Sequence, residues 1–322
     1  MRVLFRSPPY FELIQEEGLD VIPYYFQPKY QGKGALKFCW ELAGTTDLIM
    51  CPPELSARSL ALLRVAIGAR YTAGEADPPW DRLLSVSIRR DWNKSFLDAQ
   101  EELAAKLGFE TPLEGPSIAI TETESNWAQA VLRRSRISDA DVVVGVHCSA
   151  AVPDKSWSAR SFGETMHRLK AIFPNLSVIS FGIGEERSVS EAARLSAEGV
   201  HWIEGTGEWT IRQTLAMLKQ CDLFVSGDTG LMHMAAAVGT RTLSIFGPTS
   251  PVRRAPTYCG GIAVAPSTSC HPCYRLNEWT GCQCIHTIQV DQVADIARQC
   301  LLSAAEAKPG IRYCGTEATV LT

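Results

Sequence analysis

The second half of the chain alternates short apolar runs with segments whose apolar residues recur every three or four positions. The two patterns match the periods of a buried strand and of an amphipathic helix. Strands that alternate with helices at this spacing predict a parallel sheet covered on both faces. The predicted strands are 141–147, 177–181, 200–203, 223–226 and 242–246, and the predicted helices between them are 161–172, 190–198, 209–218 and 230–238.

The first half shows the same alternation less regularly. Gly68 and Gly108 each follow a helical pattern, in the position where glycine commonly ends a helix. The strong apolar strand that begins near Asp141 predicts a domain boundary just before it, with domains 1–138 and 139–305 and a tail 306–322. The predicted strands of this half are 2–5, 19–25, 46–51 and 117–121, and the predicted helices are 10–17, 56–67, 91–107 and 125–136.

Composition narrows the class of protein. Hydrophobic residues make up 46% of the 322 residues and charged residues 20%, which is typical of a globular protein with apolar content for two cores. The net charge of −4 argues against a nucleic acid partner. No window approaches about eighteen uninterrupted apolar residues, so we expect no transmembrane segment. The first apolar run is too short for a signal peptide, and we expect a cytoplasmic location.

The most informative segment runs from Cys221 to Gly239. A buried strand ends in the turn Ser226-Gly227-Asp228-Thr229-Gly230, and a helix rich in small residues follows. Ligands of open α/β sheets lie at the carboxyl ends of strands, and the N–H groups of a glycine turn and a helix N-terminus favour phosphate there. The alternative is that Asp228 and Thr229 only cap the helix, and that His233 is a structural histidine.

This segment resembles the signature of glycosyltransferase family 9, the ADP-heptose heptosyltransferases and their relatives. That signature has Asp-Thr-Gly, then two residues and a His, as in 228–233, and Phe-Gly-Pro-Thr after the next strand, as in 246–249. A small-residue loop at 147–150 and Lys-Ser-Trp at 155–157 also resemble the family pattern. The glycine-rich loop 181–186, with its acidic residues, is a third and weaker resemblance.

The resemblance implies an α/β fold of the GT-B type, with two Rossmann-like domains whose parallel sheets face a central cleft. The domain 139–305 would bind a nucleotide-sugar, and 1–138 would be the acceptor side, with its first strand unit lacking or remodelled. The implied function is an inverting glycosyltransferase that moves a sugar, expected to be heptose, from an ADP-sugar donor to an acceptor hydroxyl. No organic cofactor is implied, and the acceptor is a glycan, a protein or a small natural product.

The resemblance also implies which residues hold the donor. Lys155 would neutralise the diphosphate, which gains charge as the sugar leaves, and Asp228 would lie near the phosphates or the sugar. These two are the expected catalytic residues. Either Glu185 or Glu186 would bind the ribose, although two glutamates also suit a helix N-terminus. The full expected donor site is Ser149, Lys155, Glu185, Glu186, Asp228, Thr229, Gly230 and His233.

The general base is unknown at this level. The family opens with a strand and a Gly-Asp loop whose Asp serves the acceptor, but here the first strand leads into 6–10, Arg-Ser-Pro-Pro-Tyr. Two other functions therefore stay open: a sugar-nucleotide epimerase or hydrolase, and a catalytically impaired nucleotide-sugar-binding protein. The available carboxylates, each of which also suits an exposed surface, are Asp20, Asp47, Glu54, Asp81 and Asp91.

Four cysteines cluster near the end of the second domain. A Cys-x-x-Cys pair is followed, after eight intervening residues, by a Cys-x-Cys pair. Four thiolates suit tetrahedral zinc or iron, so the pattern predicts a structural metal, with free thiols and a disulfide as alternatives. His271 or His286 could replace one ligand. The predicted metal ligands are Cys270, Cys273, Cys282 and Cys284.

Overall fold

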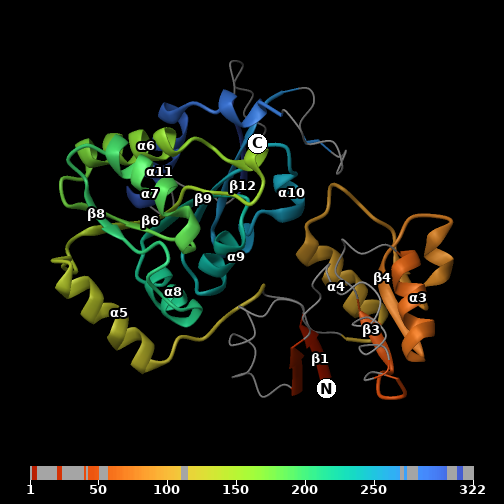
Figure 1. Ribbon diagram of the computed structural model, residues 1–322. Helices are drawn as coiled ribbons and strands as arrows, with labels where there is room; N and C mark the ends of the chain where they lie inside the picture. The colour runs from red at the N-terminus through yellow and green to blue at the C-terminus, as the bar shows by residue number, and fades with distance from the viewer. Residues whose placement is uncertain are drawn as a thin grey trace. The chain divides into compact units, whose positions relative to one another are not determined.

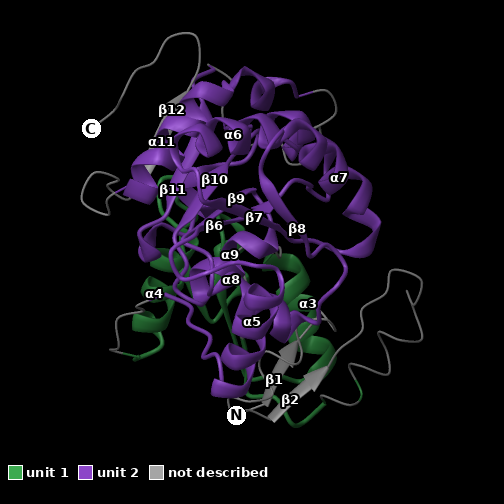
Figure 2. Ribbon diagram, turned by 90° about the vertical axis from the view of Figure 1, so that its left-hand side faces the viewer, with its two compact units in different colours: residues 1–114 green, residues 115–322 purple. Residues whose placement is uncertain are grey.

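The chain divides into two compact units, 1–114 and 115–322, which Figure 2 distinguishes by colour. The sequence pattern predicts the boundary at 138/139, whereas the structure places it between Glu114 and Gly115. The reason is that helix α5 (Glu122–Arg134) packs against helix α8 (Ile211–Leu218) of the second unit. The computed structural model describes residues 2–5, 20–23, 40, 43–50, 57–109, 115–268, 272–273, 282–302 and 310–314.

The second unit contains a seven-stranded sheet in which all neighbouring strands are parallel. One edge strand lies in the predicted tail 306–322, so this part of the tail belongs to the sheet. In spatial order the strands are β12 (Gly310–Cys314), β11 (Ile262–Pro266), β10 (Thr242–Ile245), β9 (Leu223–Gly227), β6 (Val142–His147), β7 (Leu176–Ser180) and β8 (His201–Glu204).

Helices cover both faces of this sheet (Figure 1). Helices α6, α7 and α11 lie together on one face, and α8 and α9 lie on the other. A parallel sheet needs this double cover because its strands are apolar on both sides. The bounds are α6 (Ala159–Ile172), α7 (Arg187–Ser196), α9 (Gly230–Ala237), the short α10 (Pro251–Arg254) and α11 (Val290–Leu302).

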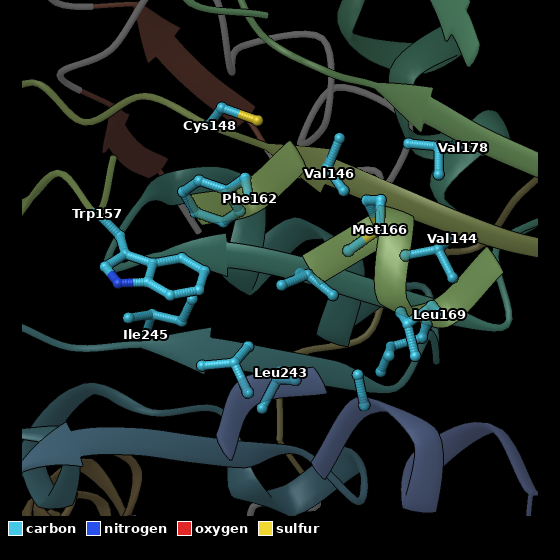
Figure 3. Close-up of a cluster of buried hydrophobic side chains, with 14 of the residues drawn as sticks. Val144, Val146, Cys148, Trp157, Phe162, Met166, Leu169, Val178, Leu243 and Ile245 are labelled. Carbon is cyan, nitrogen blue, oxygen red and sulfur yellow. The ribbon is translucent and has the colours of Figure 1, made fainter. Parts of the chain in front are cut away.

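The main core lies between the sheet and the α6 face (Figure 3). Val144 and Leu243 of the sheet meet Phe162 and Met166 of α6, and each of these side chains is at most 1% exposed. Phe162 and Met166 are four residues apart, so they lie on one side of the helix. Burying each such side chain contributes about 1.5–3 kcal/mol to the free energy of unfolding.

The first unit contains two small parallel sheets in the described residues. One pairs β1 (Arg2–Phe5) with β2 (Asp20–Pro23), and the other has the order β3-β4-β5. A capping box at Ser95 begins α4, because the Ser95 and Asp98 side chains each accept the other's backbone N–H. The remaining elements are β3 (Leu48–Met50), β4 (Tyr71–Glu75), β5 (Val86–Ile88), α3 (Ala57–Ile67) and α4 (Phe96–Lys106).

The predicted strand-helix series of the second unit is confirmed, with ends that agree to within three residues. The predicted strand 117–121 is wrong, because this segment forms no ladder and Ile118 N–H donates to the Ala237 carbonyl instead. The patterns missed β4, β5, β11, β12 and α11. The predicted helix 10–17 lies outside the described residues. No helix in the described ranges is long and apolar enough to cross a membrane.

Helix α5 is tied to the second unit by a bidentate ion pair. Arg212 of α8 donates from Nε and Nη2 to the two carboxylate oxygens of Glu124, at 2.6 and 2.7 Å. Both side chains are mostly buried. These hydrogen bonds from Arg212 outweigh the effect of burial and lower the pKa of Glu124 from 4.5 to about 2.

Replacing Glu124 with Gln should remove a pH-dependent part of the stability. A carboxyl whose pKa falls on folding stabilises fully above its unfolded pKa, and the contribution is lost as the pH drops from about 4.5 toward 2. Urea unfolding at a series of pH values should show wild type more stable by about 1 kcal/mol near neutral pH, since partial solvent screening limits the pair. That gap should close in acid.

Glu122→Gln is the matched control, because Glu122 lies exposed in the same first turn of α5. It should leave the pH profile of stability unchanged. A gap between wild type and Glu124→Gln that persists undiminished in acid would contradict this account.

Candidate functional site

The strand order of the second unit reverses between β6 and β9. The chain proceeds from β6 through β7 to β8 in one direction, then crosses back to β9 and continues through β10 to β12 in the other. The ends of the two central strands are level, since His147 and Ser226 are register partners. Ligands of open α/β sheets bind outside the carboxyl ends at such a reversal. The loops after β6 and β9 are therefore the place to look for a site.

The loop after β6 supplies Lys155, which lies at the end of a short 3-10 turn, η4 (Pro153–Lys155). Trp157 anchors this turn in the core. Its indole is 2% exposed, packs edge-on against Phe162 at 5.2 Å, and donates its N–H to the Ile288 carbonyl at 3.2 Å. The anchor limits where Lys155 can lie, which is the physical reason for a tryptophan two residues after the lysine.

Lys155 and Asp228 form an ion pair across the strand reversal. Lys155 Nζ lies 2.8 Å from Asp228 Oδ2, and the two side chains are 13% and 6% exposed. The Thr249 hydroxyl, from the loop after β10, donates to the same oxygen at 2.9 Å. An ammonium held this way at the carboxyl end of the sheet can bind an anionic ligand, and the carboxylate can accept hydrogen bonds from hydroxyl groups.

Thr229 follows Asp228 and occupies the N-cap position of α9. Its backbone is extended, and its side chain makes no capping hydrogen bond. Thr229 Oγ1 is buried and has no hydrogen-bond partner among the residues that the structure describes. The capping alternative for Thr229 is therefore wrong. A buried hydroxyl without a partner at a helix N-terminus suits a phosphate oxygen, which would accept its hydrogen.

The loop after β7 presents Glu186, at the end of a second 3-10 turn, η5 (Gly184–Glu186). Its Oε2 lies 3.1 Å from His147 Nε2 and accepts the Ile183 N–H at 2.9 Å. Burial alone would raise the pKa of Glu186, but hydrogen bonds from His147, Ile183 and the Ser149 hydroxyl lower it to about 2. Glu186 is thus a carboxylate at neutral pH.

The structure separates the two glutamates that the sequence left equivalent. Glu186 turns inward to His147, whereas Glu185 is exposed. Gly230 and His233 of α9 are also exposed, one turn apart. The predicted site residues fall into two groups. Lys155, Asp228 and Thr229 lie around the end of β9, and Ser149 and Glu186 lie together near the end of β7.

His147 and Thr249 were missed as site residues. Both stand in segments that resemble family patterns, at the end of β6 and in Phe-Gly-Pro-Thr, so a signal existed. Neither could be given a role, because their partners Glu186 and Asp228 are distant in sequence. Both roles are decided by contacts between loops that follow different strands at the carboxyl end of the sheet.

Among the described residues of the first unit, no carboxylate is marked as a base by its surroundings. Asp47 is 80% exposed, and Asp81 and Asp91 accept hydrogen bonds from nearby backbone N–H groups. Glu75 was not among the carboxylates considered from the sequence. It is buried, and its Oε2 lies 3.7 Å from Arg90 Nε. The Asp20 side chain and all of Glu54 lie outside the described residues.

The cysteine cluster is described only in part, since Cys270 lies outside the described residues. Cys273 Sγ and Cys282 Sγ are 3.8 Å apart. That exceeds a disulfide bond of about 2.05 Å, and it matches two thiolates on one tetrahedral ion with bonds of about 2.3 Å. Within the described ranges, no three His, Cys, Asp or Glu side chains gather as metal ligands. The four-cysteine metal site stays a prediction.

Comparisons with known proteins point to one family. The family model for glycosyltransferase family 9 (heptosyltransferase) matches residues 60–282. Lipopolysaccharide heptosyltransferase 2 of Escherichia coli is 24% identical over 177 residues. That match covers 53% of this chain and 47% of the relative, so the chain spans about half the length of this curated protein.

Solved structures show the same fold. A family 9 glycosyl transferase from Veillonella parvula superposes with a TM-score of 0.72 at 19% identity, covering 94% of this chain and 88% of that one. The E. coli ADP-heptose lipopolysaccharide heptosyltransferase II gives a TM-score of 0.64 at 18% identity, with 94% and 89% covered. These neighbours confirm the predicted GT-B class. Because the family model also matches more than half of the chain, this protein belongs to glycosyltransferase family 9, the heptosyltransferase family.

Proposed function

We propose that the chain is an inverting glycosyltransferase that moves a sugar, expected to be heptose, from an ADP-sugar to an acceptor hydroxyl. The observation that carries the proposal is the Lys155–Asp228 ion pair beside the unpartnered Thr229 hydroxyl at the start of α9. Family membership supports sugar transfer. The donor is taken from the ADP-heptose enzyme of E. coli, which shares the fold.

On the donor side, charge builds on the diphosphate as the bond to the sugar breaks. The Lys155 ammonium, the Thr229 hydroxyl and the N-terminal N–H groups of α9 would stabilise that charge. Asp228 would keep the ammonium in place before the donor arrives and then accept hydrogen bonds from sugar hydroxyls. Glu186 would accept from the ribose, with Ser149 beside it. Gly230 would let the phosphates approach the backbone, and His233 would line the exposed side of the turn.

On the acceptor side, inversion requires a base for the attacking hydroxyl, and we assign none. The acceptor is proposed to be a glycan, in keeping with the lipopolysaccharide named for the E. coli relatives. A protein or a small natural product is the alternative acceptor. The cytoplasmic location and the cysteine-bound metal remain predictions, and neither enters a step of this mechanism.

The donor site predicts nucleotide selectivity. Calorimetric titration of ADP, UDP and GDP should show preferential binding of ADP. Lys155→Ala should weaken ADP binding about tenfold or more, because it removes a charge-assisted contact and leaves Asp228 buried without its cation. Asp228→Ala should affect ADP less than it affects the intact ADP-sugar.

Lys219→Ala is the matched control, since Lys219 is exposed at the end of α8 on the same unit. Its ADP affinity should equal that of wild type. If well-folded wild type binds none of the three nucleotides, the donor-site assignment fails.

Two threonines with buried hydroxyl groups should behave in opposite ways when replaced by valine. Thr229 Oγ1 has no partner in the described structure, so Thr229→Val should cost little stability but weaken ADP binding severalfold. Thr240 Oγ1 donates to the Leu218 carbonyl at 2.7 Å, so Thr240→Val should lower the free energy of unfolding by about 1–3 kcal/mol. Its ADP affinity should not change.

Paired thermal denaturation and calorimetry measure both effects. Thr229→Ser, which keeps the hydroxyl, should restore ADP affinity. A Thr229→Val protein that binds ADP like wild type would remove the hydroxyl from the proposed phosphate site.

Product analysis with radiolabelled ADP-heptose tests the reaction itself. Sugar on a glycan acceptor with inverted anomeric configuration is the expected result, and Lys155→Ala should abolish most of it. Altered or hydrolysed donor would indicate an epimerase or hydrolase. Unchanged donor with saturable binding across a panel of glycan, protein and small-molecule acceptors would indicate a binding protein.

A further inference from the structure

His147 is the last residue of β6, and the proposed donor chemistry does not yet use it. Its side chain is 7% exposed and lies 3.1 Å from Glu186 through Nε2. An ionised carboxylate can only accept hydrogen bonds, so Nε2 carries the hydrogen in this contact. The other ring nitrogen, Nδ1, is buried and has no hydrogen-bond partner among the described residues. The ring therefore makes one directional contact, and that contact is to Glu186.

We propose that His147 is a positioning residue for the ribose of the donor: it holds the Glu186 carboxylate in the orientation that receives a ribose hydroxyl. This inference rests on the proposed function, which gives Glu186 the ribose. It adds a residue for which the sequence suggested no role, and it explains how one glutamate is selected over its neighbour.

The carboxylate has room left for a further donor. Its two oxygens offer about four acceptor sites. His147 and the Ile183 N–H both bind Oε2. The Glu186 side chain is still 21% exposed, so a donor can approach it from solvent. A sugar hydroxyl is a suitable occupant because it donates without bringing charge.

The backbone at Gly182 also favours this position of the Glu186 carboxylate. Gly182 lies directly after the end of β7, with φ of +150°, a conformation that side chains disfavour. A Cβ at this position would lie 2.6 Å from Glu186 Oε2 and 3.4 Å from His147 Cδ2. Any larger residue at 182 would therefore push the carboxylate out of the position in which His147 holds it. Gly182 leaves space for the Glu186 carboxylate, and His147 holds the carboxylate in that space.

Holding the carboxylate in advance matters because a glutamate has three rotatable bonds. A free side chain would lose that freedom when it bound a hydroxyl, which would weaken binding. With His147 in place, the Glu186 side chain is already ordered when the protein folds. Loss of His147 should therefore reduce the affinity that depends on the ribose hydroxyl and leave the affinity that depends on the phosphates.

The experiment compares ADP with 2′-deoxy-ADP and 3′-deoxy-ADP by calorimetry. Wild type should prefer ADP over at least one deoxy analogue by about tenfold or more, as expected for a hydrogen bond to a charged group. His147→Phe, which keeps a ring but removes the donor, should shrink that preference to within about threefold. His147→Gln offers an amide N–H to Glu186 and should regain most of the preference.

Glu186→Ala should lose the preference to the same extent as His147→Phe, and combining the two should reduce it no further. Gly182→Ala should also lose it, although His147 is intact. His167→Phe is the matched control, because His167 is exposed on α6. The preference is a ratio measured on one protein sample, so a partly unfolded variant does not distort it.

The outcomes separate the two proposals. If wild type binds no ADP, the proposed function fails. If wild type binds ADP with a ribose preference and His147→Phe weakens all three nucleotides equally, His147 is merely structural and this inference is overturned. A ribose preference in Glu186→Ala equal to that of wild type would overturn it as well.

Discussion

The reversal of strand order between β6 and β9 is the constraint on which the rest of the site depends. The helices that follow these two strands, α6 after β6 and α9 after β9, lie on opposite faces of the sheet, so the carboxyl ends of the two strands are left uncovered. Lys155 comes from one side of the reversal and Asp228 from the other, and their ion pair spans it. Without this topology the two residues, distant in sequence, would not share a site.

Charges at this edge are held in pairs. The Lys155 ammonium is balanced by Asp228, and the Glu186 carboxylate is held by hydrogen bonds from His147 and its neighbours. An unpaired charge at this depth would be costly, so pairing lets a largely apolar sheet carry ionised groups. Two neutral polar atoms of the site, the Thr229 hydroxyl oxygen and His147 Nδ1, are by contrast buried without a partner in the described structure. An incomplete hydrogen-bond set beside complete ion pairs is typical of a site that a ligand completes.

Rigid packing below the site supports these contacts. The Trp157 indole sits in the same cluster as Phe162 and the strand residues Val146 and Ile245 (Figure 3). Lys155 is two residues from that anchor, so movement of its backbone would disturb the core. A close-packed interior resists such movement. The position of the ammonium is thus a consequence of core packing as much as of its ion pair.

Local patterns in the sequence were enough to predict much of the second unit. The spacing of apolar residues located the central strands and helices of this unit. The strands there are short, mainly apolar runs, and the helices have apolar residues every three or four positions. Family motifs pointed to Lys155 and Asp228, since short stretches of chain carry them. The patterns failed for β4, where Tyr71–Glu75 contains a glycine and a glutamate, and for β11 and β12, which lie beyond the family motifs.

What the sequence determined by itself was the class of fold, the order of most elements and the identity of the motif residues, all of which depend on neighbours along the chain. Only the tertiary structure decided which glutamate turns inward, that His147 meets it, that Thr249 reaches Asp228, and that α5 belongs to the second unit. Each of these depends on side chains that are far apart in the sequence and meet only when the sheet has formed. Periodicity carries no information about such contacts, because it records the burial of a residue and not its partner.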